Sequence, residues 1–165
     1  MTPQPTGLIR LTGGGRDLVL TRTFRADIDD VWASMTEPER TARWFGTWSG
    51  EAGPGKTIRF RPTFEEGAPE SDMVIDACEP PHHLAVSTVD ENGAWYLEAQ
   101  LEQSGDTTTL LFTHHLHDDV DAGSVGPGWE YYLDMLVASR DGSPQPNFDD
   151  YFPAQQAHYE SFGQT

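Results

Sequence analysis

The residue whose side chain is best suited to catalysis or ligand binding is a histidine at the end of an alternating apolar run. In Leu110-Leu-Phe-Thr-His114, His114 shares a strand face with Leu110 and Phe112. A histidine on an apolar face could orient a ligand or move a proton in a pocket. It could equally be a core histidine whose ring nitrogens are satisfied by the protein. As an acid or base, its candidate partners are Tyr96, Tyr132 and Asp76.

A metal site is the next chemistry to weigh. His114 and His115 point to opposite faces of a strand, so they cannot bind one ion together. His115 and His117 could share a face, and Asp118 or Asp119 would complete a set suited to zinc or nickel. The sequence has no C-x-x-C or H-E-x-x-H motif, and these aspartates lack EF-hand spacing. We therefore predict neither a metal ion nor another cofactor.

Nucleophilic and phosphate-binding chemistry have no support in the sequence. The single cysteine, Cys78, lies near Asp76 in a predicted strand, and there is no G-x-S-x-G motif. The run Gly13-Gly-Gly15 lacks the spacing of phosphate-binding loops, and no helix follows it. We interpret it as a hairpin turn.

Composition excludes several classes of partner. The net charge is −17, which disfavours binding to nucleic acid and to anionic membrane surfaces. The N-terminus has no secretory pattern, and no apolar run approaches the roughly 20 residues of a bilayer span. One cysteine suits a reducing compartment. These features predict an acidic cytoplasmic protein.

The elements that must position these residues are read from periodicity. Residues 94–102 and 109–114 predict a hairpin, and further strand patterns cover 8–11, 17–24, 57–64, 73–78 and 84–88. Asp27 is the expected N-cap of a first short helix, and a second short helix ends at Gly46. From about Gly126, apolar residues at helical spacing predict a longer helix that stops at Asp141-Gly142. Segregated strands and helices predict an α+β fold with helices on one face of an antiparallel sheet.

Four sequence motifs in order resemble one protein family. They are Val31-Trp32 with Met35-Thr-Glu-Pro-Glu-Arg40 and Ala42-Arg-Trp-Phe-Gly46, then Glu79-Pro-Pro-His-His-Leu84, then Leu110-Leu-Phe-Thr-His114, and finally Gly128-Trp129 followed by Leu133 and Leu136. The chain is similar over about residues 17–140 to the START/Bet v 1-like (SRPBCC) superfamily. Within it, the resemblance is to the branch named for the C-terminal domain of the activator of Hsp90 ATPase.

The resemblance implies a helix-grip fold. In that fold a curved antiparallel sheet wraps around a long C-terminal helix, with two short helices after the first strand and an apolar cavity between sheet and helix. The family includes small-ligand carriers, cyclases and co-chaperone domains, so the fold leaves the function open.

The leading hypothesis is a binding protein for a small apolar molecule, with no covalent chemistry. Its predicted ligand-binding residues are Trp44, Phe45, Phe60, Phe64, Met73, Trp95, Leu97, Phe112, His114, Trp129 and Leu133. The alternatives are a cyclase, dehydratase or hydrolase that uses His114, and a co-chaperone or regulatory domain that binds a basic partner through its acidic surface.

We expect one domain over residues 1–165, with a core of about 8–142 and a tail of 143–165 packed on it. The tail carries Phe148, Tyr151, Phe152, Tyr159 and Phe162, too many aromatic residues to leave in water. It is expected to end in a short helix over about 153–162. It could cover the cavity mouth near Arg40 and Arg43 as a lid, which we favour, or act as a strap against the sheet or a second subunit of a homodimer.

Overall fold

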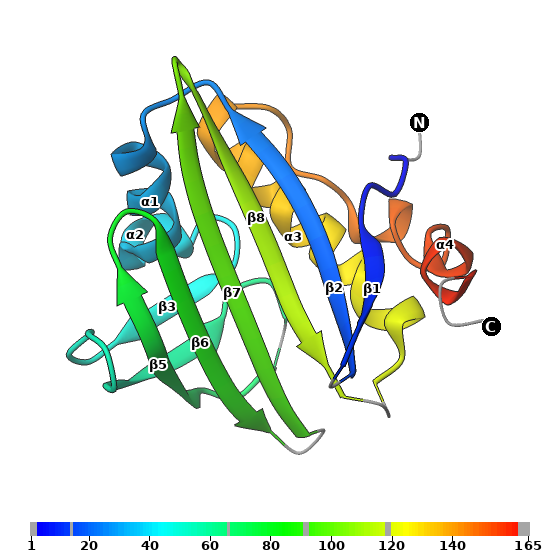
Figure 1. The fold of residues 1–165 in the computed structure, drawn as a ribbon, viewed down its shortest axis with the longest axis horizontal. Helices are drawn as coiled ribbons and strands as arrows, with labels where there is room; N and C mark the ends of the chain where they lie inside the picture. The colour runs from blue at the N-terminus through cyan, green and yellow to red at the C-terminus, as the bar shows by residue number, and fades with distance from the viewer. Residues whose placement is uncertain (1–2, 14, 66, 91–92, 118–119, 162–165) are drawn as a thin grey trace.

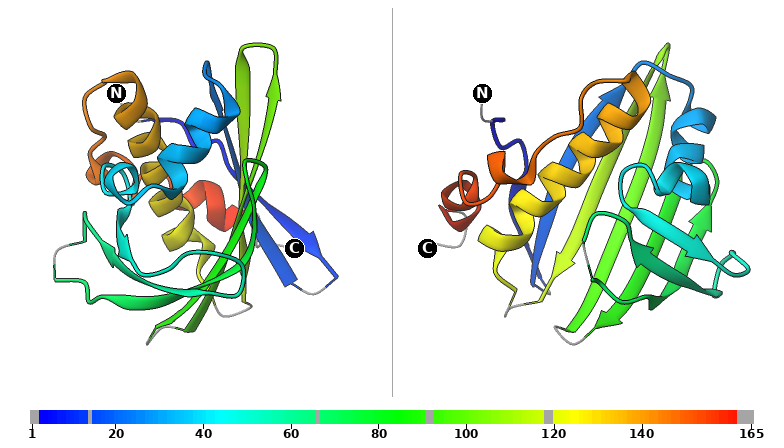
Figure 2. Two further views of the ribbon diagram at one scale, coloured as in Figure 1. Left: turned by 90° about the vertical axis from the view of Figure 1, so that its left-hand side faces the viewer. Right: turned by 180° about the vertical axis from the view of Figure 1, so that it is seen from behind.

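The computed structural model describes residues 3–13, 15–65, 67–90, 93–117 and 120–161. Its centre is an eight-stranded antiparallel sheet with strand order β1-β2-β8-β7-β6-β5-β4-β3. The sheet curves around one long helix, α3, and two short helices close one end (Figures 1 and 2). The predicted helix-grip α+β fold is confirmed.

The strands and helices follow one another as a hairpin, two helices, a meander and a final helix with its tail. The strands are β1 (Leu8–Thr12), β2 (Gly15–Phe24), β3 (Gly46–Ser49), β4 (Thr57–Pro62), β5 (Ser71–Glu79), β6 (His83–Asp90), β7 (Gly93–Ser104) and β8 (Thr107–Leu116). The helices are α1 (Ile28–Thr36), α2 (Pro38–Thr41), α3 (Ala122–Asp141), a 3₁₀ turn (Phe148–Asp150) and α4 (Gln156–Glu160). The two short helices come after β2, because residues 8–12 form a further strand at the edge of the sheet.

The central hairpin of β7 and β8 places the predicted apolar face against α3. Leu97 pairs with His114, and Leu101 pairs with Leu110, so these side chains lie on the face that packs on α3, here called the inner face. Glu98 and His115 lie on the opposite, outer face. Alternation along the strands therefore separates an apolar inner face from a polar outer face, as predicted.

The long helix starts earlier than the sequence predicts. It begins at Ala122, where the Asp121 side chain accepts a hydrogen bond of 3.0 Å from the Gly123 amide as N-cap. The sequence predicts a start near Gly126 because residues 117–123 have the composition of an acidic loop and the apolar residues at helical spacing begin only at Trp129. The end is as predicted: Gly142 has a φ of 77°, a left-handed conformation that glycine adopts without strain.

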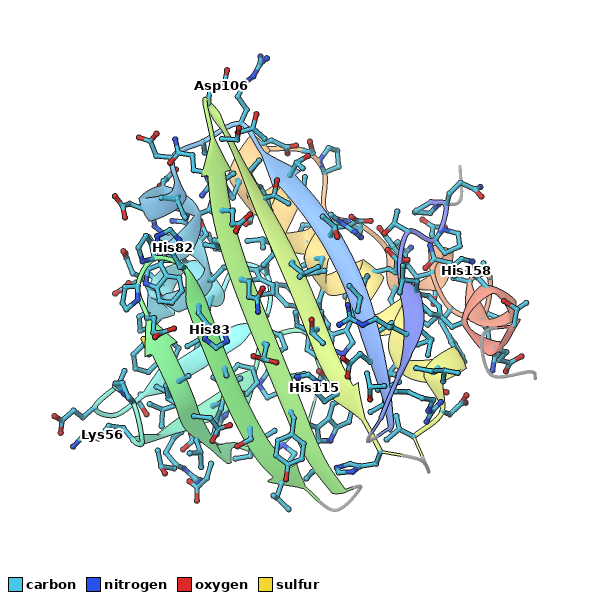
Figure 3. All side chains as sticks on the ribbon, viewed as in Figure 1. Lys56, His82, His83, Asp106, His115 and His158 are labelled. Carbon is cyan, nitrogen blue, oxygen red and sulfur yellow. The ribbon has the colours of Figure 1, made fainter. Side chains whose placement is uncertain are left out.

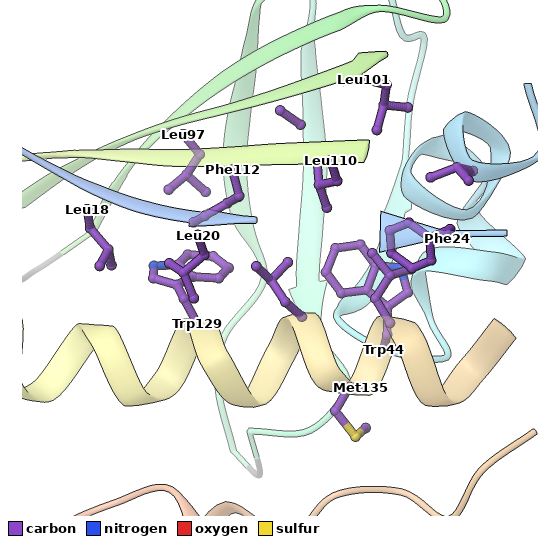
Figure 4. Close-up of a cluster of buried hydrophobic side chains, with 14 of the residues drawn as sticks. Leu18, Leu20, Phe24, Trp44, Leu97, Leu101, Leu110, Phe112, Trp129 and Met135 are labelled. Atoms are coloured by element: carbon purple, nitrogen blue, oxygen red, sulfur yellow. The ribbon is translucent and has the colours of Figure 1, made fainter. Parts of the chain in front are cut away.

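The main hydrophobic core lies between α3 and the inner face of the sheet. Trp129 points from the helix toward the sheet, where Leu110 and Phe112 are buried (Figure 4). Leu133 and Leu136 belong to the same buried cluster. Met135 points to the opposite side of α3, where the chain beyond the helix runs (Figure 4). The helix is therefore buried on two sides, not one.

The second buried side of α3 is organised by one carboxylate. Glu130 is 1% exposed and accepts hydrogen bonds from the Thr6 amide (2.6 Å), the Thr6 hydroxyl (2.7 Å), the Gly7 amide (3.1 Å), the Arg22 guanidinium (2.9 Å) and the Tyr159 hydroxyl. These donors come from the N-terminal segment, β2 and α4. One side chain of α3 thus joins both ends of the described chain.

The tail packs along α3 toward its N-terminal half (Figure 2, right). Tyr151 and Tyr159 are buried, and the Tyr151 hydroxyl donates a 2.7 Å hydrogen bond to Asp134. The short helix α4 covers part of the predicted 153–162, and Phe162 lies outside the described residues. These contacts are with α3 and the N-terminal segment, so the expectation of docking near Arg40 and Arg43 was wrong. Within the described ranges, no helix is long and apolar enough to cross a bilayer.

Candidate functional site

A cavity lies between the inner face of the sheet and α3, in two compartments. The inner compartment has a volume of about 180 Å³ and lies toward α1 and α2; the outer one has about 630 Å³ and lies toward the β4–β5 loop and the first half of α3. Five residues line both compartments and form the boundary between them: Phe45, Phe60, Met73, Leu97 and Trp129. The two volumes are therefore adjacent parts of one site.

The boundary is built mainly from aromatic rings. The Phe45 ring centroid lies 4.7 Å from that of Phe60 and 5.7 Å from that of Trp129. Phe45 follows α2, between two tryptophans that are tied to α1. The Trp44 indole N–H donates to the Ser34 carbonyl (2.8 Å), and that of Trp48 donates to the Thr36 carbonyl (2.9 Å). The last carbonyls of α1 lack partners within the helix, so these bonds satisfy them and hold the aromatic run in place.

The inner compartment is lined almost wholly by apolar side chains. Besides the boundary residues they include Trp44, Ile75, Val86, Phe112 and Leu133, and the Cys78 thiol borders the same space. Glu98 contributes to the lining, but its carboxylate is bonded on the outer face to His83 and His115. Burial of apolar ligand surface is the main interaction that this compartment offers.

The outer compartment adds polar groups to an aromatic wall. Phe64, Trp95, Tyr131, Tyr132 and Phe148 contribute rings, and Glu65 contributes a carboxylate. The Tyr132 hydroxyl donates a 2.5 Å hydrogen bond to Glu65, which joins α3 to the β4–β5 loop. Burial and the Glu65 charge raise the pKa of Tyr132, so its hydroxyl remains a neutral donor.

The structure brings ten of the eleven predicted ligand-binding residues to the cavity wall. Trp44, Phe112 and Leu133 line the inner compartment, Phe64 and Trp95 line the outer one, and the five boundary residues line both. His114 is not among the lining residues of either compartment.

His114 lies behind the wall, between two tryptophans. It is 1% exposed, its ring stacks on Trp95 at 4.9 Å, and its Nδ1 accepts a 3.1 Å hydrogen bond from the Trp129 indole N–H. Burial, with smaller contributions from the nearby His115 and His117, lowers the pKa of His114 to about 4. The ring is therefore neutral at pH 7 with its proton on Nε2, and it holds Trp129 in position. This arrangement favours the core-histidine interpretation over acid–base catalysis.

The histidine metal site that was considered from the sequence is not formed by the residues that the structure describes. His115 bonds through Nδ1 to Asp17 (2.7 Å) and through Nε2 to Glu98. Asp118 and Asp119 lie outside the described residues. Within the described ranges, no group of three or more histidine, cysteine or acidic side chains is arranged to hold a metal ion.

Sequence reasoning missed a chain of polar contacts across the outer face. It runs over five adjacent strands: Arg10 to Asp17 (3.3 Å), Asp17 to His115 (2.7 Å), His115 to Glu98, and Glu98 to His83 (2.8 Å). Figure 3 shows His83 and His115 on this face of the sheet. Alternation alone places each residue outward, but their contact depends on strand order and register, which the sequence pattern does not specify.

Comparison with family sequence models gives one match. The model described as "Activator of Hsp90 ATPase homolog 1-like protein" matches residues 25–139, a range that includes α1, α2, the meander and almost all of α3. Comparison with curated protein sequences gives no match.

Several solved structures share the fold. The crystal structure of CalU16 from Micromonospora echinospora is 26% identical, with a TM-score of 0.78 over 100% of both chains. EF2215 from Enterococcus faecalis, a conserved protein of unknown function, is 22% identical, with a TM-score of 0.72 over 94% of this chain and 88% of that chain. DynU16, from the dynemicin biosynthetic locus, is 22% identical, with a TM-score of 0.68 over 80% of this chain and 50% of that chain.

Proposed function

Because this chain belongs to the family of activator of Hsp90 ATPase homolog 1-like proteins, whose fold is used to bind hydrophobic ligands, we propose that it binds a small apolar molecule between the sheet and α3. In this proposal the ligand is held by burial and ring stacking, and no covalent bond is made or broken. The ligand occupies the outer compartment and extends an apolar end past Phe45 into the inner one.

The observation that carries the proposal is the size and lining of the cavity. The outer compartment alone, at about 630 Å³, falls within the roughly 300–1,000 Å³ of typical small-molecule sites. Its walls combine aromatic and aliphatic side chains with a few polar groups, which is the usual composition of such sites. A core built only for stability would be expected to fill this space.

The state of His114 supports binding over catalysis. A general acid or base must come within hydrogen-bond reach of the reacting group. The Nδ1 atom of His114 already accepts a hydrogen bond from the Trp129 indole, and the His114 ring is stacked on Trp95. We therefore assign His114 the role of a positioning residue for the tryptophan wall.

A matched pair of substitutions tests the proposal. Val86 lines the inner compartment, whereas Val74, on the adjacent strand β5, is 36% exposed and does not line the cavity. We expect Val86→Phe to fill part of the inner compartment and weaken binding of the uncharged probe N-phenyl-1-naphthylamine about tenfold, whereas Val74→Phe should leave it unchanged. Probe fluorescence measures both affinities, and circular dichroism confirms that each variant folds.

A second readout does not depend on a variant. Cys78 is the only cysteine and borders the inner compartment. Bound probe should slow the reaction of its thiol with a small neutral maleimide. Equal probe affinity in both valine variants, together with an unprotected Cys78, would contradict binding in this cavity.

A further inference from the structure

The charged side chains that line the cavity are all acidic. The chain has ten lysine and arginine residues, and all of them lie within the described ranges. None of them lines either compartment. Two glutamates line the cavity, Glu98 and Glu65. The carboxylate of Glu98 is bonded to His83 and His115 on the outer face, which leaves Glu65 as the acidic group available to a ligand.

The nearest stretch rich in arginine sends its charges away from the cavity. On β4, Ile58 and Phe60 point inward, so the alternating Arg59 and Arg61 point outward. Arg59 forms ion pairs there with Glu70 (2.8 Å) and Asp72 (2.7 Å). An anionic ligand group would therefore be buried without a compensating charge, which disfavours its binding.

Three aromatic rings line the same compartment as the Glu65 carboxylate. Tyr132, which binds Glu65, has its ring centroid 5.4 Å from that of Tyr131, and Tyr131 lies 5.5 Å from Phe148. All three rings line the outer compartment, and Phe148 is 42% exposed at its rim. Ring faces attract cations, and several rings with a carboxylate form the usual environment for an ammonium group.

Glu65 keeps acceptor capacity for a ligand. A carboxylate has about four lone-pair sites, and the Tyr132 hydroxyl occupies one of them. The remaining sites can receive an N–H donor or face a quaternary nitrogen. Tyr132 remains the neutral donor that orients the carboxylate, since the pKa of its hydroxyl is raised.

We propose that the outer compartment recognises an ammonium group, so that the ligand is a cationic amphiphile with an apolar body. Its nitrogen lies beside Glu65 and the rings of Tyr131, Tyr132 and Phe148, and its apolar part extends toward the inner compartment. This inference rests on the proposed function and adds the charge class of the ligand to it.

Three ligands with the same alkyl chain test the charge preference. Dodecyltrimethylammonium, dodecanol and dodecanoate are each used, below their aggregation concentrations, to displace N-phenyl-1-naphthylamine at 0.15 M salt, which screens the net surface charge. We expect the ammonium compound to bind about tenfold more tightly than the alcohol, and the carboxylate to bind more weakly than the alcohol.

A matched pair of charge-neutralising variants assigns the preference to Glu65. Glu65→Gln and Glu102→Gln change the net charge equally, and both carboxylates are exposed, but Glu65 lines the outer compartment whereas Glu102, on β7, does not line the cavity. We expect Glu65→Gln to reduce the advantage of the ammonium compound over the alcohol at least fivefold, and Glu102→Gln to leave it unchanged. Tyr131→Leu, which removes one ring, should reduce it by a smaller factor.

The outcomes separate this inference from the proposed function. Dodecanoate binding as tightly as the ammonium compound would overturn the charge preference while leaving apolar binding in place. An ammonium preference that is equal in Glu65→Gln and Glu102→Gln would assign it to the general surface charge and overturn the site. Failure of all three ligands, dodecanol included, to displace the probe would overturn the proposed function itself.

Discussion

Two neighbouring histidines on β8 show how the face of a strand decides the chemistry of a side chain. Burial among tryptophans lowers the pKa of His114 to about 4, and its ring stays neutral. Partial burial also lowers the pKa of His115, but hydrogen bonds to Glu98 and Asp17 outweigh this effect and raise it. The residue type is the same, and the surroundings set opposite charge states.

The raised pKa of His115 predicts a pH-dependent contribution to stability. A group whose pKa is higher in the folded state stabilises the fold below its unfolded pKa, about 6.5, and loses that contribution as the pH rises through the folded value. Burial acts to raise the pKa of Glu98, but hydrogen bonds from His115 and His83 outweigh burial, so the pKa of Glu98 is lowered overall. The stability that the Glu98 carboxylate contributes is therefore lost at acidic pH. The contact should therefore contribute most between about pH 4.5 and 6.5.

The measurement compares His115→Gln with the unaltered protein by urea unfolding at pH 5.5, 7 and 9. The difference in unfolding free energy should be about 1 kcal/mol or less at pH 5.5, since the His115 side chain is 41% exposed, and should shrink toward pH 9. His117→Gln, two residues along the chain, is the control. A difference that grows with pH would mean that the charged form of His115 is not the stabilising one.

At the scale of elements, the inner face was predictable and the start of α3 was not. Leu97, Ala99 and Leu101 alternate with polar residues, and such alternation needs no knowledge of strand order. The first turn of α3, from Ala122, has no apolar residues at clear helical spacing and includes Gly123, which is a poor helix former. This low propensity is overridden by packing that only the folded chain provides.

That packing predicts opposite effects at two glycines of α3. A Cβ at Gly126 would overlap the ring of Tyr159, whereas a Cβ at Gly128 would meet no atom within 4 Å. Replacing glycine by alanine in a helix normally stabilises it by about 1 kcal/mol, so we expect Gly128→Ala to raise the unfolding free energy by up to that amount. Gly126→Ala should lower it by about 1–3 kcal/mol, because the ring must move.

Urea unfolding of the two variants measures this pair directly. If Gly126→Ala were as stable as Gly128→Ala, α4 would not be seated on α3 as described. Restoration of stability by a smaller residue in place of Tyr159 in the Gly126→Ala background would identify the ring as the cause.

At the scale of the whole molecule, much of the cavity wall could be anticipated, but the contacts that join distant segments could not. Ten predicted residues reach the cavity because aromatic residues on inward positions must meet across a sheet wrapped around a helix. Glu130 gave no comparable signal. In sequence it is a charged residue beside Trp129, and its partners lie more than a hundred residues away in Thr6, Gly7 and Arg22.

The prediction for the whole molecule is that Glu130→Gln is strongly destabilising. Burial raises the pKa of Glu130, but hydrogen bonds from Thr6, Tyr159 and Arg22 outweigh this and lower it, so the buried group is a carboxylate. The amide keeps the shape but removes the charge facing Arg22, and we expect a loss of about 2–3 kcal/mol in unfolding free energy. Glu102→Gln, at an exposed position, should change it by less than about 0.5 kcal/mol. An equal effect of the two substitutions would contradict the role assigned to Glu130.

The position of the Glu130 partners along the chain also orders events during translation. Thr6, Gly7 and Arg22 leave the ribosome before α3 does, and their donors are available as soon as Glu130 appears. Tyr159 is made 29 residues later, so the last donor reaches the carboxylate only after the sheet, the helix and nearly all the described chain have been synthesised. The sheet-facing side of α3 therefore packs on residues that are all made before the helix, whereas its second side also needs residues that are made after it.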